Sequence, residues 1–156
     1  PHEDLRGSFC ELYSFRKFAI IREDISLINV SVSARAGTLR GLHYQEQPFA
    51  QEKFVLCLRG RIRDIVVDLR PESPTCHRSF SKDLSENSTE GGFIPREMAH
   101  GWQALSDHAS ILYVVFGAGY EPKSERGLRY NDPKLGIEWP LKPTVVSDRD
   151  NSWPLL

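Results

Sequence analysis

Two of the five histidines in this chain stand near residues that could help them move protons. His43 lies in the stretch GTLRGLHYQ, three residues after Arg40, and Lys53 follows in the next apolar segment. His100 lies in IPREMAHGW, after a turn that contains proline. Imidazole changes its charge near neutral pH, guanidinium binds anions, and ammonium stabilises a developing oxyanion. These residue types favour proton transfer on an anionic substrate, although a lone histidine is at least as often a packed core residue.

The same histidines also permit a metal hypothesis. Small β-barrels of the cupin type often use a His-x-His pair, a glutamate and a distant histidine, but Gln45 stands where the second histidine of the pair would be. A triad of His43, Glu46 and His100 would still suit a non-haem iron site. Glutamate at such a spacing is commonly an exposed surface residue, so the metal hypothesis is the weaker of the two.

Carboxylates and a tyrosine could complete a proton-transfer site. Asp64 lies in an apolar segment, where it could orient Lys53 or face solvent beside neighbouring arginines. Asp150 ends the polar turn SDRD, and it matters only if the chain folds back to His43, because a carboxylate fixes the tautomer of an imidazole. Tyr113 lies in SILYVVFG, where a tyrosine usually packs, but a phenol that faces the cavity could donate a proton opposite the base.

The elements that must position these residues are short strands. Turn signals of glycine and proline recur along the chain, with β-branched and aromatic segments between them. The predicted strands cover residues 27–33, 53–60, 61–70, 79–84, 91–95 and 110–117. Helix signals are weak, with one or two short turns expected in residues 11–25. This pattern predicts an all-β jelly-roll barrel in one domain, residues 1–156, whose mouth would gather the polar residues.

The C-terminal part of the chain is rich in proline and aromatic residues. Tyr130, Leu135, Ile137 and Trp139 make it too apolar for a disordered tail. We therefore expect it to pack over the barrel without adding strands.

Composition narrows the classes of partner and compartment. The chain has 20 basic and 21 acidic residues, and this balance provides no basic field for nucleic acid or an anionic membrane. Cys10, Cys57 and Cys76 are odd in number and form no CxxC pair, which indicates reduced thiols in a cytoplasmic protein. No apolar run reaches the length of a membrane span, and we see no signal peptide.

Five blocks of the sequence resemble the dTDP-4-dehydrorhamnose 3,5-epimerase family of nucleotide-sugar epimerases. The blocks are GTLRGLHYQ, KFVLCLRGRIRDIVVDLRPESPT, IPREMAHGWQALSD, YEPKSERGLRYNDPKLGIEWP and SDRD, in the family's order and at nearly its spacing. The resemblance runs from DLRGSF at residue 4 to the end of the chain. It implies a cupin-like jelly roll that works as a homodimer and needs neither metal nor cofactor.

The resemblance also implies the roles of the residues that would move protons. His43 looks like the family's catalytic base and Asp150 like the carboxylate paired with it. Tyr113 matches the acid on the opposite face of the sugar, and Lys53 matches the lysine near the ketone oxygen. The expected substrate is a dTDP-linked 4-keto-6-deoxy sugar, whose protons at C3 and C5 are acidic because an enolate can form.

A second set of residues is expected to bind that substrate. Its members are Arg6, Phe9, Glu11, Ser31, Arg40, Gln45 and His100. Arg6 and Arg40 match groups that hold the diphosphate, while Phe9 and Glu11 match residues that one subunit lends to its partner.

Departures from the family pattern leave the number of inverted centres open. Leu27 stands where the family usually has glutamine, and the stretch between Tyr113 and Tyr120 is one residue longer than usual. The chain could therefore invert C3, C5 or both. Two other classes stay as alternatives, namely a metal-dependent cupin oxygenase and a sugar-binding jelly roll without activity.

Overall fold

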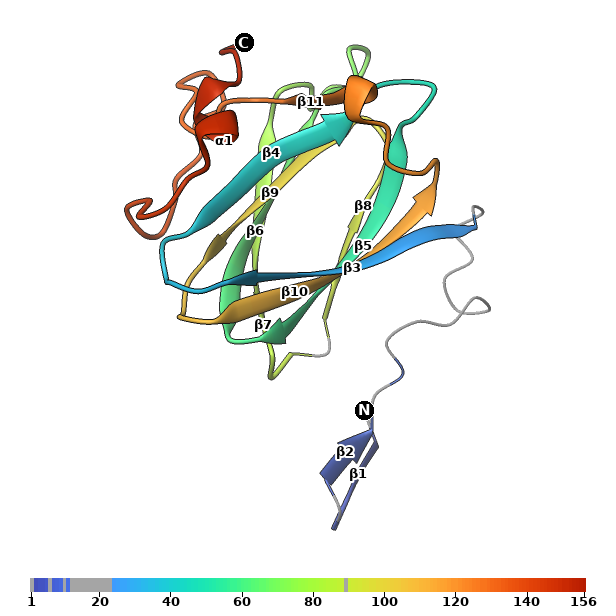
Figure 1. Ribbon diagram of the computed structural model, residues 1–156, viewed down its shortest axis with the longest axis vertical. Coiled ribbons are helices and arrows are strands. Elements are labelled where there is room, and N and C mark those ends of the chain that lie inside the picture. The colour runs from blue at the N-terminus through green and yellow to red at the C-terminus, as the bar shows by residue number, and fades with distance from the viewer. Residues whose placement is uncertain (1, 6, 10, 12–23, 89) are drawn as a thin grey trace.

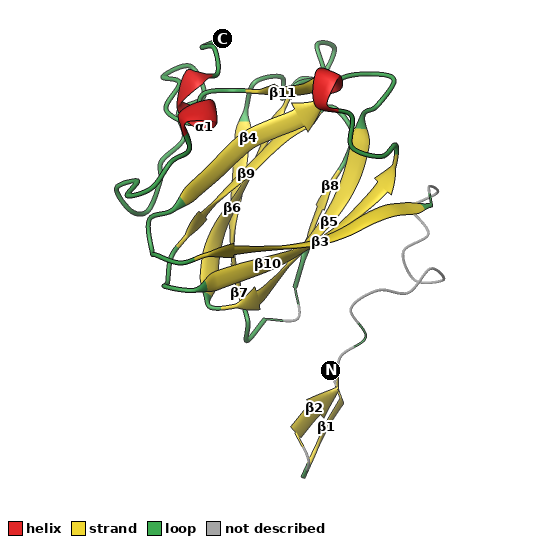
Figure 2. Ribbon diagram, in the orientation of Figure 1, coloured by secondary structure: helices red, strands yellow, loops and turns green. Residues whose placement is uncertain are grey.

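The computed structural model describes residues 2–5, 7–9, 11, 24–88 and 90–156. The main body consists of two antiparallel β-sheets that face each other as a jelly-roll sandwich (Figure 1). Figure 2 shows how little helix accompanies the strands. The all-β jelly roll predicted from the sequence is thus confirmed, and no helix in the described residues is long and apolar enough to cross a membrane.

One sheet has four strands in the order β3-β10-β5-β8, and the other has five in the order β11-β4-β9-β6-β7. The first sheet contains β3 (Ile25–Ser33), β5 (Gln51–Arg59), β8 (Gly92–Ile94) and β10 (Ala109–Gly117). The second contains β4 (Leu39–Gln45), β6 (Arg61–Asp68), β7 (Ser79–Ser85), β9 (Met98–Ala104) and β11 (Glu125–Gly127). A separate hairpin pairs β1 (His2–Asp4) with β2 (Gly7–Phe9).

All six predicted strands are present, as β3, β5, β6, β7, β8 and β10. Strands β4 and β9 and the three-residue strands β1, β2 and β11 were not among them. A 3₁₀ turn, η1 (Pro122–Ser124), and one short helix, α1 (Asp148–Ser152), complete the described elements. Most of the weak helical segment expected in residues 11–25 lies outside the described residues.

Apolar side chains fill one end of the space between the sheets. Val55, Ile62, Trp102 and Ile111 are almost fully buried there and belong to one contiguous cluster. Because every second side chain of a strand lies on the same face, other inward-facing positions of the same strands can hold polar residues farther along that space.

The C-terminal part packs against the outer face of the five-stranded sheet, as predicted. Leu42 and Ile65 on that face form a buried cluster with Leu128 and Leu135 of the tail. The tail ends near α1, which lies beside β4 (Figure 1). This return of the chain brings Asp150 to the strand that carries His43.

A register shift in β4 turns two functional side chains to the same side. Strict alternation would place Arg40 and His43 on opposite faces, but the pairing of β4 with β9 shifts between these residues. Gly41 and Gly101 allow the close approach, because a Cβ on Gly41 would lie 2.6 Å from the Cα of Gly101. Gly41 also has φ of 113°, which favours glycine.

Candidate active site

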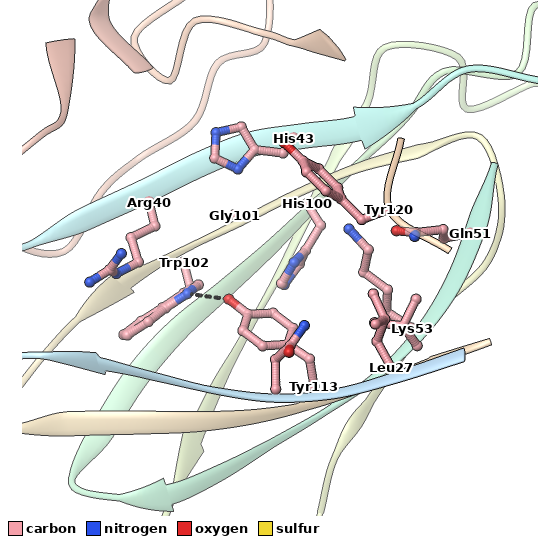
Figure 3. Close-up of a pocket in the computed structure, with 12 residues that line it drawn as sticks. Leu27, Arg40, His43, Gln51, Lys53, His100, Gly101, Trp102, Tyr113 and Tyr120 are labelled. Carbon is pink, nitrogen blue, oxygen red and sulfur yellow. Dashed lines mark hydrogen bonds between the residues drawn. The ribbon is translucent and has the colours of Figure 1, made fainter. Parts of the chain in front are cut away.

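A cavity of about 210 Å³ opens between the two sheets at the polar end of the sandwich (Figure 3). Strands of both sheets contribute to its wall. The lining residues are Leu27, Asn29, Arg40, His43, Gln51, Lys53, His100, Gly101, Trp102, Tyr113, Val115 and Tyr120. Five of the residues singled out from the sequence therefore meet here: Arg40, His43, Lys53, His100 and Tyr113.

His43 is paired with Asp150 across 107 residues of sequence. The Nε2 atom of His43 lies 2.6 Å from Oδ1 of Asp150. The other carboxylate oxygen accepts a hydrogen bond from the backbone N–H of Gly41, and Ser147 caps the short helix that carries Asp150. An ionised carboxylate only accepts hydrogen bonds, so Nε2 holds the proton and Nδ1 keeps a lone pair. This is the arrangement of a general base.

The ionised form of Asp150 is favoured despite its burial. Burial alone would raise the pKa of this carboxyl group, but the hydrogen bond and the charge of His43, together with the Gly41 N–H, lower the pKa below its ordinary value. The side chain of His43 is 31% exposed and that of Asp150 is 5% exposed. The imidazole is thus open to a ligand, whereas the group that orients it is shielded.

Tyr113 lies on the opposite wall of the cavity, on β10 (Figure 3). The indole Nε1–H of Trp102 donates a hydrogen bond of 2.7 Å to the phenol oxygen. The ring of His100 meets the ring of Tyr113 edge to face, at 5.9 Å between centroids. Burial raises the pKa of the phenol, so Tyr113 is protonated at neutral pH and can act as an acid.

Lys53 enters the cavity from β5 (Figure 3). Burial lowers the pKa of its ammonium group, and the carboxylate of Glu125 opposes that shift. An ammonium group in such a shielded place stabilises negative charge more strongly than it would in water.

His100 forms a second histidine–carboxylate pair. Its Nε2 atom lies 2.7 Å from Oδ1 of Asp64, and both side chains are buried. The suggestion that Asp64 orients Lys53 is therefore wrong, because its carboxylate bonds His100, which lies diagonally across from it: the register of β6 against β9 pairs Asp64 with Trp102.

A second hollow, of about 440 Å³, adjoins the cavity and shares Arg40, His43 and Tyr113 with it. Ser31 lines this hollow, and Arg149 adds a second guanidinium. Arg40 is held in place by hydrogen bonds to Oγ of Ser33 and to the carbonyl of Val32. Two arginines beside the polar cavity suit an anionic group on the ligand.

Gln45, expected among the substrate-binding residues, does not line the cavity. Its side chain is buried, and its amide bonds backbone groups of Phe49, Gly119 and Glu121. Gln45 therefore fixes the loop that leads to Tyr120.

The described residues do not assemble the alternative metal triad. Glu46 forms an ion pair of 2.9 Å with Arg126, while His43 and His100 each use one ring nitrogen in a hydrogen bond to a carboxylate. No group of three histidine, cysteine, aspartate or glutamate side chains in the described part of the chain could hold a metal ion.

The N-terminal members of the expected binding set are not placed by the structure. Arg6 lies outside the described residues, and for Phe9 only the backbone in β2 is described. Glu11 is exposed.

The sequence reasoning missed several residues of the site. Trp102 and Tyr120 line the cavity, and Tyr120 donates a hydrogen bond to Glu125, which also pairs with Arg149. Trp102 follows His100 by two positions, so alternation along β9 could have placed both on the inner face.

Comparisons with known proteins agree with one another. A family model described as dTDP-4-dehydrorhamnose 3,5-epimerase matches residues 1–156. The dTDP-4-dehydrorhamnose 3,5-epimerase of Sinorhizobium fredii is 41% identical over 156 residues, covering 98% of this chain and 80% of the relative.

Solved structures give the same result at the level of the backbone. The chain resembles a dTDP-4-dehydrorhamnose 3,5-epimerase from Bacillus anthracis, crystallised with TDP and PPi, with a TM-score of 0.94, 37% identity and coverage of 98% and 88% of the two chains. It also resembles ChmJ, a 3'-monoepimerase from Streptomyces bikiniensis, with a TM-score of 0.90, 33% identity and coverage of 99% and 78%. That ChmJ crystal, in complex with dTDP, contained a double mutant with a histidine changed to asparagine and a tyrosine to phenylalanine.

Proposed function

The chain belongs to the dTDP-4-dehydrorhamnose 3,5-epimerase family, and we propose that His43 and Tyr113 carry out its epimerisation of a dTDP-linked 4-keto-6-deoxy sugar. The observation that carries this proposal is one cavity with a carboxylate-paired imidazole on one wall and a protonated phenol on the opposite wall. Lys53 lies on a strand next to that of Tyr113 and lines the same cavity.

The first half of the reaction removes a proton next to the ketone. Nδ1 of His43 takes the proton from C3 or C5, and the electron pair of the C–H bond becomes the enolate. Asp150 stabilises the imidazolium that forms. The ammonium group of Lys53 stabilises the negative charge on the enolate oxygen, a kind of contact whose removal costs about 100- to 1000-fold in rate.

The second half returns a proton to the other face of the same carbon. The O–H bond of Tyr113 breaks, a new C–H bond forms, and the carbonyl is restored as the enolate collapses. Tyr113 is left as a phenolate and His43 as an imidazolium, so proton exchange with solvent resets both groups. These steps use only side chains of the protein, without a metal or cofactor.

The ChmJ double mutant supports the assignment of the two residues. Its substituted histidine and tyrosine lie as far apart in sequence as His43 and Tyr113 do in this chain. Because relatives include both 3,5-epimerases and a 3'-monoepimerase, the proposal covers inversion at C3, C5 or both.

The substrate-binding part of the proposal follows the charges. The diphosphate would lie over the second hollow, where Arg40 and Arg149 supply positive charge. Within the inner cavity, His100 would contact the sugar. The N-terminal residues Arg6 and Phe9 would complete the nucleotide site.

We further propose that the chain acts as a homodimer. On the edge strand β3, Leu27 and Asn29 face the cavity, while Ile28, Val30 and Val32 are each more than half exposed on the other side. An exposed row of β-branched residues on an edge strand suits burial by another subunit. A dimer would also let Phe9 and Glu11 of one subunit reach the nucleotide site of the other. A stable monomer at micromolar concentration in sedimentation experiments would contradict this part of the proposal.

A cytoplasmic location forms part of the same proposal. Cys57 and Cys76 are free thiols, which suits a reducing compartment.

The test of the catalytic roles is Tyr113→Phe, followed in deuterated water with dTDP-4-keto-6-deoxyglucose as substrate. The variant keeps the ring and loses the proton donor. His43 still exchanges the substrate proton from its own face, so deuterium should still enter while inversion falls. General acid catalysis is typically worth about 100- to 10,000-fold, so NMR at C3 and C5 should separate the two rates.

Two outcomes would overturn the assignment. An equal loss of exchange and inversion would make Tyr113 a packing or binding residue. Unchanged inversion would mean that another group, such as Tyr120 at the end of the longer loop, delivers the proton.

A further inference from the structure

Trp102 is buried between two groups of the site that the proposed reaction uses. Its side chain is 1% exposed, and its only polar atom, Nε1, points to the phenol oxygen of Tyr113 at 2.7 Å (Figure 3). The guanidinium of Arg40 lies over the same indole, 6.0 Å from the ring. Trp102 thus contacts the acid with its edge and the anion-binding arginine with its face.

The hydrogen bond between Trp102 and Tyr113 can run in only one direction. An indole N–H can only donate, so the phenol oxygen must accept, and the proton of the phenol is directed away from Trp102. When Tyr113 gives up that proton, the electron pair stays on the oxygen that already faces the indole N–H. A hydrogen bond to a charged acceptor is stronger than one to a neutral acceptor, so the contact strengthens as the phenolate forms.

We propose that Trp102 is a positioning residue for Tyr113, whose indole N–H aims the phenol proton at the substrate and stabilises the phenolate left after reprotonation. This inference rests on the proposed function, since it assumes that Tyr113 is the acid. Burial raises the pKa of the phenol and the Trp102 hydrogen bond opposes that rise, which agrees with this role.

Other charged groups near the phenol must stay constant in any test. They come from the strands packed around β10 and from the facing sheet: Arg40, His43, Lys53, Asp64 and His100. A change of Trp102 to phenylalanine leaves all of them in place and still offers Arg40 an aromatic face.

The chain contains a matched control for this change. Trp139 also donates its indole N–H at 2.9 Å, but to the backbone carbonyl of Tyr130 in the C-terminal part. Trp139→Phe therefore removes the same atoms and the same type of hydrogen bond outside the cavity. Comparing the two variants separates loss of the N–H at Tyr113 from the general cost of trimming a tryptophan.

The first measurement is the ratio of inversion to solvent exchange in deuterated water. In Trp102→Phe we expect inversion to fall about 10- to 100-fold relative to exchange, with KM nearly unchanged. The reason is that the missing N–H matters most once Tyr113 has donated its proton and its oxygen carries a negative charge. Trp139→Phe should leave the ratio as in the unchanged protein. Equal ratios in the two variants would overturn the inference while leaving the role of Tyr113 intact.

The second measurement reads the phenol directly. Difluorotyrosine at position 113 titrates at lower pH than tyrosine and can be followed by fluorine NMR. Loss of the Trp102 N–H should raise the pKa of this phenol by about 1 to 2, and loss of the Trp139 N–H should not change it. An unchanged pKa in Trp102→Phe would show that the indole does not stabilise the phenolate.

An isosteric replacement covers the case in which Trp102→Phe does not fold. Benzothienylalanine at position 102 keeps the shape of the indole and replaces N–H by sulfur. The same fall in the inversion-to-exchange ratio is expected, and an unchanged ratio would overturn the inference. If Tyr113→Phe itself left inversion unchanged, the proposed function would fail first, so the two failures are distinguishable.

Discussion

Two histidines that line the cavity are each paired with a carboxylate at nearly the same distance but in different surroundings. His43 and Asp150 are 2.6 Å apart, and His100 and Asp64 are 2.7 Å apart. The two histidines are neighbours across β4 and β9. The side chain of His43 is 31% exposed, whereas that of His100 is only 4% exposed. A carboxylate partner therefore does not by itself make a histidine a base, because the free ring nitrogen must also lie beside the substrate hydrogen that is removed.

The pairs also differ in how the chain builds them. Asp64 and His100 lie on paired neighbouring strands of one sheet and meet diagonally, since the register pairs Asp64 with Trp102, two residues after His100. Asp150 comes from a short helix after the tail has crossed the outer face of the sheet. The position of Asp150 against His43 thus depends on how the tail packs. The pair of His100 and Asp64 depends only on the sheet, and its imidazole supports the ring of Tyr113.

The largest difference between the pairs is expected on removing the imidazoles. His43→Asn should lower deuterium uptake at C3 and C5 by about 100- to 10,000-fold, the range for a general base. His100→Asn should reduce uptake much less, because the proposed mechanism has His43, and not His100, abstract the proton. Thermal unfolding of both variants would check that they are folded. Equal losses in two folded variants would contradict the distinction drawn here.

A smaller difference is expected from the two carboxylates. Asp150→Asn lets an amide donate to His43 and so favours the wrong tautomer, and we expect exchange to fall about 10- to 100-fold, as for loss of a hydrogen bond to a charged group. Asp64→Asn should affect exchange less and inversion more, because His100 supports Tyr113. NMR rates at C3 and C5 measure both. The reverse pattern would place the base at His100.

The contrast between the pairs also shows what the sequence could predict. β-Branched and aromatic segments between turn signals predicted six of the strands and the jelly-roll class, because such side chains pack well on the pleated, half-buried surface of a sheet. The joint orientation of Arg40 and His43 could not be predicted, since it depends on a register shift in β4. The suggestion that Asp64 orients Lys53 failed for a related reason. The neighbours of Asp64 depend on how β6 pairs with β9, and the sequence of one strand does not fix that pairing.

Contacts between residues far apart in sequence are the second feature that could not be predicted from the sequence alone. Asp150 was assigned to His43 only through resemblance to a known family, since SDRD alone indicates a polar turn. Gln45 was expected to bind the substrate, but its amide bonds backbone groups of the chain, and a buried amide of this kind looks the same in sequence as one that binds a sugar. Trp102 was overlooked because a tryptophan in a strand usually signals packing, and the direction of its N–H is a tertiary feature.

The smallest expected effect concerns acid stability, and it separates the carboxylate that orients the proposed base from a purely structural carboxylate. The pKa values of both Asp150 and Asp132 are lowered in the folded chain. Burial is the largest single influence on the pKa of Asp150 and raises it, but the hydrogen bond and the charge of His43, together with the Gly41 N–H, outweigh burial and lower the pKa. For Asp132 the leading cause is the hydrogen bond from the backbone N–H of Leu156. A carboxyl with a lowered folded pKa adds stability above its ordinary pKa, and this stability is lost as pH falls through the folded value.

Asp150→Asn and Asp132→Asn should therefore each lower the free energy of unfolding at pH 7 by about 1 to 3 kcal/mol. Both losses should shrink as pH falls below 3.8, the ordinary value for an aspartate, because the unfolded chain of the unchanged protein takes up a proton there before the folded chain does. Denaturant unfolding between pH 7 and pH 3 measures this dependence. Only Asp150→Asn should also slow deuterium exchange, because Asp132 contacts the backbone of the tail and not His43. If Asp132→Asn slowed exchange equally, the effect of Asp150→Asn on the reaction would come from lower stability. The proposal that Asp150 orients His43 as the base would then lose its support.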